Sequence, residues 1–130
     1  MGDLPATWRL PAIPGSVPSL RRKLLEAISG RGFDEHAVGL AVTEALTNAV
    51  RHAYPGSQGP VTLSVKQAAD QLVVVVADEG IGARSVPARS RPERGRGMGL
   101  LLLRELCTVA RVEPGSSGTV VTMGFARDGR

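Results

Sequence analysis

The chain has 130 residues, a mass of 13.6 kDa and a formal net charge of +4. This length is typical of one domain that builds its core without a disulfide or a metal. The single cysteine excludes an internal disulfide and a zinc site built on cysteines. The chain has only four aromatic residues, which argues against a binding surface of stacked rings.

The positive charge is concentrated in one segment. Residues 84–96 hold five arginines and one glutamate, and the rest of the chain is balanced. An anionic ligand or partner is therefore expected to be attracted to this segment. A nucleic-acid-binding module and a simple solvated loop are the alternatives that such a run leaves open.

No stretch of the sequence suggests a membrane protein. The apolar runs are far shorter than the roughly 20 residues needed to cross a bilayer. Residues 1–10 lack the charged start and apolar run of a secretory signal. A cytoplasmic protein with one reduced cysteine and no membrane partner is expected.

Two helices are predicted in the N-terminal half, after a short edge strand at residues 8–13. Ser16 is the expected N-cap of the first helix, and the glycines at 30 and 32 are expected to end it. Asp34 is the expected N-cap of the second helix. The apolar residues of that helix recur every three or four positions as far as Tyr54, where Pro-Gly follows.

Four strands and a third helix are predicted in the C-terminal half. Strands at 61–65 and 72–77 form a hairpin, and strands at 109–113 and 119–125 follow a helix at 100–107. The 72–77 strand is apolar at successive positions, as in a central strand covered on both faces. The grouping of strands favours an α+β fold with two layers: a mixed, mostly antiparallel sheet with helices on one face.

A polar stripe interrupts the second helix. Glu44, Asn48 and His52 are four residues apart, so they lie on one face. An asparagine among apolar helical residues needs a partner, because a buried amide without one costs about 1–3 kcal/mol. A metal with its waters or a ligand would supply that partner. The alternative is a solvated polar face.

A second motif, residues 78–82, follows the apolar strand directly. Asp78 at the end of a central strand can accept a hydrogen bond from an exocyclic amine such as that of adenine. Gly80 and Gly82 would let the backbone approach a flat ligand closely. A plain turn after a strand is the alternative, since Asp and Gly are common there.

A third motif, residues 95–100, has glycines at alternate positions and leads into the third helix. Such a segment can point backbone amides at an anion, and the helix dipole adds to the attraction. It is neither a Walker A loop nor the dinucleotide fingerprint, because the residues that define those motifs do not follow.

In this order, the three motifs resemble those of the GHKL (Bergerat-fold) ATPases. The 44–54 segment is similar to that of the anti-sigma factor serine/threonine kinases of the RsbW/SpoIIAB type. The resemblance spans about residues 33–125. It implies a histidine-kinase-like ATPase fold, one domain over residues 1–130, an ATP lid at 83–97, and ATP and Mg²⁺ as cofactors.

The resemblance also implies roles for individual residues. Glu44 would be the catalytic base that takes a proton from the attacking hydroxyl, Asn48 would coordinate Mg²⁺, and Asp78 would hold the adenine amino group. The residues implied to bind the nucleotide are Asn48, Asp78, Gly80, Gly82, Arg94, Gly95, Arg96, Gly97, Met98, Gly99, Leu100 and Thr119.

The partners follow from the same resemblance. The substrate would be a serine or threonine of a STAS-domain anti-anti-sigma factor, and the second partner an RNA polymerase sigma factor. Members of the family often form homodimers through the N-terminal strand and helix, so the resemblance allows a homodimer here, although nothing in residues 1–32 requires one. A non-catalytic nucleotide-binding regulator of the same fold is the main alternative. The few aromatic residues and the balanced charge outside 84–96 disfavour direct binding of nucleic acid.

Overall fold

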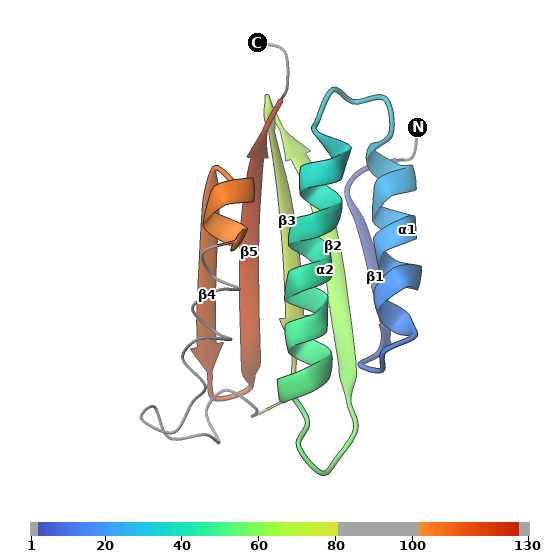
Figure 1. The fold of residues 1–130 in the computed structure, drawn as a ribbon, viewed down its shortest axis with the longest axis vertical. Helices are drawn as coiled ribbons and strands as arrows, with labels where there is room; N and C mark the ends of the chain where they lie inside the picture. The colour runs from blue at the N-terminus through green and yellow to red at the C-terminus, as the bar shows by residue number, and fades with distance from the viewer. Residues whose placement is uncertain (1–2, 81–101, 128–130) are drawn as a thin grey trace.

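The structure is a computed structural model that describes residues 3–80 and 102–127 (Figure 1). Residues 102–106 are helical. The longer elements follow in the order β1 (Ala6–Pro11), α1 (Ser16–Ile28), α2 (Glu35–His52), β2 (Pro60–Ala68), β3 (Gln71–Asp78), β4 (Val109–Gly115) and β5 (Gly118–Ala126). None of the helices in the described ranges is long and apolar enough to span a bilayer.

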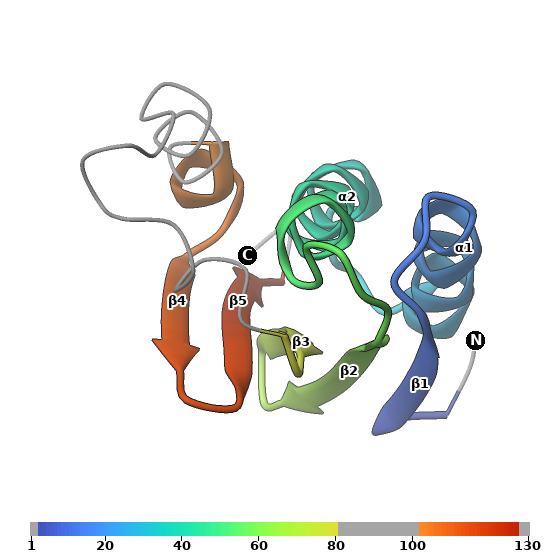
Figure 2. The same ribbon diagram turned by 90° about the horizontal axis from the view of Figure 1, so that it is seen from below.

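The strands form one sheet in the order β1-β2-β3-β5-β4. Each neighbouring pair is antiparallel, so the expected mixed sheet is wrong in that detail. The two helices and the 102–106 turn all lie on one face of the sheet (Figure 2). The α+β class and the one-sided arrangement of helices are thereby confirmed.

The core lies between that face and the helices. Side chains alternate in β2 and β3, so that every second residue is buried. The largest fully buried side chains are Leu20, Leu24, Ile28, Leu46, Leu63, Leu72, Leu103, Met123, Val38, Val42, Val61 and Val65. These side chains are all aliphatic except for that of Met123, as befits a chain with only four aromatic residues.

The prediction that β3 is covered on both faces is wrong. Val73 and Val75 are only half-buried, because both long helices pack on the opposite face. Their partial shielding comes from side chains of the flanking strands, where Val75 lies between Ser64 of β2 and Thr122 of β5.

The cap of α2 is as predicted, and that of α1 is not. The Asp34 carboxylate accepts a hydrogen bond from the Ala37 amide at 3.1 Å, which satisfies a free donor of the first turn. In α1 the N-cap is Gly15, without a side-chain hydrogen bond. Ser16 is instead the first helical residue and is buried, with 5% of its surface exposed.

The N-terminal strand lies at the edge of the sheet, as predicted. It begins and ends two residues earlier than expected, at Ala6 and Pro11, and pairs only with β2. This places Arg9 opposite Thr62, near the start of β2, where the chain enters the sheet after α2.

Candidate functional site

The polar stripe of α2 lies on a defined flank of the helix. Gly39 faces α1, since a β-carbon there would lie 3.2 Å from the Arg21 Nε. At 3.6 residues per turn, Asn48 lies about half a turn around the axis from Gly39. Glu44 lies beside Asn48 on the same flank, which faces away from α1. In Figure 2 the 102–106 turn lies on that side of α2.

Glu44 and Asn48 are half-buried and remain available for a ligand. Both side chains have intermediate exposure, so neither is a solvated surface group nor part of the core. Within residues 3–80 and 102–127 neither side chain makes a hydrogen bond to another protein group. A carboxylate and an amide, one helical turn apart on an accessible flank, can accept a proton and ligate a cation. His52 is also half-buried, one turn further on.

Asp78 ends β3 with one oxygen already occupied. Its Oδ1 accepts hydrogen bonds from the Gly80 amide at 3.0 Å and from the Thr119 amide at 3.2 Å. The two amides fix the rotation of the carboxylate. In the part of the chain that the structure describes, no hydrogen bond reaches Oδ2. That oxygen can accept a hydrogen bond from the amino group of a ligand.

Two glycines allow the segments around Asp78 to approach one another. A β-carbon at Gly80 would clash with the carbonyl oxygen of Ala53, the C-cap of α2. A β-carbon at Gly118 would clash with the Asp78 carbonyl oxygen, and Gly118 also has a positive φ of +134°. These contacts bring together the end of α2, the end of β3 and the start of β5.

The structure thus gathers several predicted site residues into two neighbouring groups. Asp78, Gly80 and Thr119 form one group, although Thr119 acts there through its backbone amide. Glu44 and Asn48 form the other, on the helix whose end touches Gly80. The expected lid at 83–97 lies outside the described ranges. So do the expected site residues Gly82, Arg94, Gly95, Arg96, Gly97, Met98, Gly99 and Leu100.

Tyr54 belongs to this site, and the sequence reasoning gave it no role. Its hydroxyl accepts a hydrogen bond from the Glu79 amide at 2.8 Å and donates one to the Pro60 carbonyl oxygen. The only signal in the sequence was its place directly after the polar stripe. An ion pair between Arg9 and Glu79, 3.1 Å apart and exposed, adds a contact from β1.

The donor set fits a magnesium ion that is carried by a ligand. Among the residues the structure describes, no three His, Cys, Asp or Glu side chains gather into a metal-binding cluster. Mg²⁺ in nucleotide sites is usually held by one or two protein oxygens, with phosphate and water oxygens completing its shell. Asn48 has a half-buried amide with no hydrogen-bond partner among residues 3–80 and 102–127, so it can provide one such oxygen.

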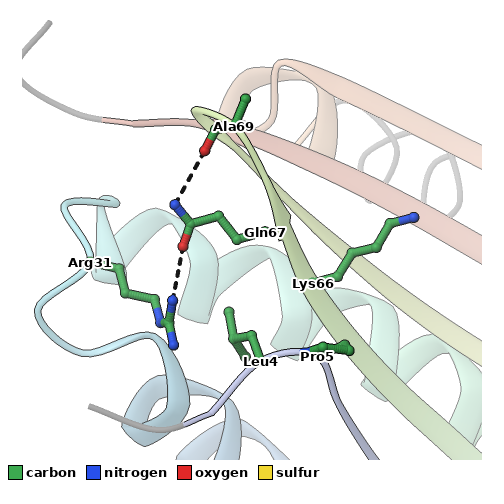
Figure 3. Close-up of a pocket in the computed structure, with 6 residues that line it drawn as sticks. All are labelled: Leu4, Pro5, Arg31, Lys66, Gln67 and Ala69. Atoms are coloured by element: carbon green, nitrogen blue, oxygen red, sulfur yellow. Dashed lines mark hydrogen bonds between the residues drawn. The ribbon is translucent and has the colours of Figure 1, made fainter.

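A separate pocket of about 310 Å³ lies at the other end of the sheet (Figure 3). It is lined by Leu4, Pro5, Arg31, Lys66, Gln67 and Ala69. The Arg31 guanidinium there is used internally, by Gln67 at 3.0 Å and by the Ala27 carbonyl at 3.2 Å. Because Val61 at the opposite end of β2 is the partner of Asp78, this pocket is distinct from the site described above.

The antiparallel sheet, its one-sided helices and the pairing of a Glu/Asn helix with a strand-end aspartate define a nucleotide-binding domain of the histidine kinase type. A family model described as the histidine kinase-like ATPase domain matches residues 10–125. The serine-protein kinase RsbW of Listeria innocua is 36% identical over 116 aligned positions, covering 77% of this chain and 73% of that protein. The chain therefore belongs to the histidine kinase-like ATPase family, and within it to the RsbW type of serine-protein kinase.

Other relatives agree with this placement. RsbW of Bacillus pumilus is 29% identical, covering 90% of this chain and 83% of that protein. The anti-sigma F factor of Clostridium acetobutylicum is 35% identical over 83 positions, or 58% of each chain. The resemblance to anti-sigma factor kinases inferred from the three motifs is confirmed.

Solved structures support the fold. The crystal structure of the RsbU and RsbW domains of a Mycobacterium tuberculosis protein matches with a TM-score of 0.73 and 24% identity, covering 98% of this chain and 34% of that one. The histidine kinase domain of a blue-light activated kinase from Erythrobacter litoralis matches with a TM-score of 0.60 and 25% identity, covering 87% and 60%.

Proposed function

We propose that this chain is an ATP-dependent protein kinase and anti-sigma factor. It would phosphorylate a serine or threonine of a STAS-domain anti-anti-sigma factor and bind an RNA polymerase sigma factor in a partner-switching system. The observation that carries the proposal is the pairing on α2: Glu44 and Asn48 are accessible, half-buried and one turn apart. The relatives named serine-protein kinase RsbW and anti-sigma F factor support it.

Each half of the site has a distinct task in this proposal. The Asp78 carboxylate, fixed through Oδ1, offers Oδ2 to the adenine amino group. Asn48 would hold Mg²⁺ through its amide oxygen, and the bound ion would supply positive charge to the phosphates. Glu44 accepts the proton of the substrate hydroxyl while the hydroxyl oxygen bonds to the γ-phosphorus and ADP leaves. The chemistry then depends chiefly on positioning and charge, as is usual in phosphoryl transfer.

The arginines of residues 84–96 supply positive charge beside the triphosphate in this proposal. Arg94 and Arg96 are the proposed phosphate contacts, and the glycines of 95–99 the proposed source of backbone amides. The single domain over 1–130, the lid at 83–97, the homodimer and the cytoplasmic location all stay predictions from the family resemblance.

The direct test uses γ-labelled ATP and candidate STAS-domain proteins from the same organism. Wild-type protein is expected to transfer label to the STAS protein. In Asn48→Ala, adding Mg²⁺ should no longer raise the affinity for ATP. Glu44→Gln should bind Mg-ATP normally and transfer no label.

Two outcomes would argue against this account. If ATP binds and no phosphoprotein forms with any cognate STAS protein, the chain is a non-catalytic nucleotide-binding regulator. If Glu44→Gln and Asn48→Ala lose binding equally, Glu44 is a ligand-binding residue and not the base. A matched control is Thr47→Ala, on the same helix between the two residues and half-exposed, which should leave both activities unchanged.

A further inference from the structure

The Tyr54 side chain connects three segments of the site: the end of α2, the start of β2 and the residue after Asp78. It lies two residues beyond the end of α2. Its hydroxyl donates to the carbonyl oxygen of Pro60, the first residue of β2, at 2.5 Å and accepts from the Glu79 amide at 2.8 Å. The hydroxyl thus uses its proton on β2 and a lone pair on the residue that follows Asp78.

The position of this hydroxyl is fixed by the packing of the ring. Gly59 lies directly against the ring, and a β-carbon at that position would clash with the ring carbons. On the other side of the junction, Gly80 sits against the Ala53 carbonyl. The two residues that follow Asp78 are therefore each held in place: Glu79 by the tyrosine hydroxyl and Gly80 by the end of α2.

The hydroxyl remains a donor over a wide pH range. Burial raises the pKa of Tyr54, and the negative charges of Asp78 and Glu79 raise it further, while the hydrogen bond from the Glu79 amide lowers it. The protonated form is the one that can donate to the Pro60 carbonyl. The link between β2 and the 78–80 segment therefore persists at neutral pH.

We propose that Tyr54 is a positioning residue for base recognition. By holding the Glu79 amide, Tyr54 fixes the backbone directly after Asp78. The Asp78 Oδ1 atom then keeps its hydrogen bonds from the Gly80 and Thr119 amides, so that Oδ2 points in one direction. A carboxylate oxygen in a fixed direction accepts a hydrogen bond from the amino group of adenine and repels the carbonyl oxygen that guanine has in its place. This inference rests on the proposed function, since it assumes that the nucleotide base lies at Asp78.

The inference separates Tyr54 from the residues on the phosphate side. Asn48 would act on the triphosphate through Mg²⁺, whereas Tyr54 would act on the base alone. Loss of the Tyr54 hydroxyl should therefore weaken ATP and ADP by the same factor and leave the effect of Mg²⁺ intact. Loss of Asn48 should weaken only the Mg²⁺-dependent part of triphosphate binding.

The test compares Tyr54→Phe with wild type by calorimetric titration of ATP, ADP and GTP, with and without Mg²⁺. Tyr54→Phe keeps the ring that packs on Gly59 and removes both hydrogen bonds. We expect ATP and ADP to bind about threefold to tenfold more weakly, which is the loss typical of a hydrogen bond, and the preference for ATP over GTP to fall. The matched control is Thr7→Val, which removes the exposed hydroxyl bond from Thr7 to Ser64 on the open face of the sheet and should change no affinity.

A double-mutant cycle with Asp78→Asn tests whether Tyr54 acts through Asp78. The two substitutions should be non-additive, because the second has little left to disturb once the first is made. Additive losses, or an unchanged ATP-to-GTP ratio in Tyr54→Phe, would overturn the role of Tyr54 while leaving the proposed function standing. If wild-type protein binds no adenine nucleotide, the proposed function fails and this role fails with it.

Amide hydrogen exchange provides a reading that does not depend on affinity. The Glu79 amide should exchange slowly in wild type and markedly faster in Tyr54→Phe, while the amides of central β3 stay unchanged. A Glu79 amide that exchanges at the same rate in both proteins would also contradict the proposal. If Tyr54→Phe does not fold, the wild-type protein alone provides the test. Slow exchange of the Glu79 amide that becomes slower still with ATP supports the role of the Tyr54–Glu79 hydrogen bond in base recognition, and exchange that ATP does not change overturns it.

Discussion

Gly80→Ala is the perturbation that probes the junction between α2 and Asp78 most sharply. A β-carbon at Gly80 would clash with the carbonyl group of Ala53. Both partners are backbone, one at the end of a helix and one directly after a strand, so no flexible side chain can move aside. The 78–80 segment must shift away from α2.

The magnitude follows from what that shift disrupts. Inserting a methyl group into a filled site costs about 1–3 kcal/mol. The shift also strains the bond from the Glu79 amide to the Tyr54 hydroxyl, worth about 0.5–1.5 kcal/mol. The free energy of unfolding should fall by about 2–4 kcal/mol, which lowers Tm by roughly 5–15 °C for a domain of this size.

Urea unfolding and nucleotide titration measure the two consequences separately. Gly15→Ala is the matched control, because no atom lies within 4 Å of a β-carbon there and its backbone is in the helical region. That control should change the free energy of unfolding by less than about 1 kcal/mol and leave ATP affinity unchanged. Gly80→Ala should lose both stability and ATP affinity. Equal stability and equal ATP affinity in the two variants would refute the reasoning.

Three further substitutions test other parts of the account. Asp34→Ala removes the N-cap of α2 and should lower the free energy of unfolding by about 0.5–2 kcal/mol, as measured in urea; no change would mean that the cap is unimportant. Arg127→Met loses the 2.6 Å hydrogen bond to the Arg31 carbonyl and should cost about 1 kcal/mol or more, whereas Arg104→Met, at an exposed position, should cost nothing. Burial raises the pKa of Cys107 to about 11, so its thiol should react slowly with alkylating reagents at pH 8. The unfolded chain loses the thiol proton at a lower pH than the folded chain does, so the free energy of unfolding should fall as the pH rises from about 9 to 11. This fall should be larger in wild type than in Cys107→Ala.

Local signals in the sequence predict most of the elements and the relative placement of several candidate site residues. Asp34 predicted the start of α2, and the spacing of four placed Glu44 and Asn48 on one flank. Asp78 was identified because a carboxylate follows a buried strand. Each of these inferences depends only on residues that are close together in the chain, where propensity and period apply.

The contacts that complete the site depend on pairing between distant segments. The Thr119 amide reaches Asp78 across 41 residues, and the Glu79 amide reaches Tyr54 across 25. The first contact depends on the register of β3 with β5 and the second on where the end of α2 lies against β3, and periodicity determines neither. The sidedness of β3 is not predicted for a similar reason: a run of valines is typical of a strand buried on both faces, whereas the helices in the described residues all lie on one face.

The central claim is that a nucleotide binds between α2 and the end of β3. Its most direct test is to map the backbone amides that shift in NMR spectra when Mg-ATP is added to the full chain. Among the described residues, the largest shifts are expected at Gly80, Thr119 and Asn48. Shifts confined to the Arg31 and Lys66 pocket at the other end of the sheet, or none at all, would contradict it.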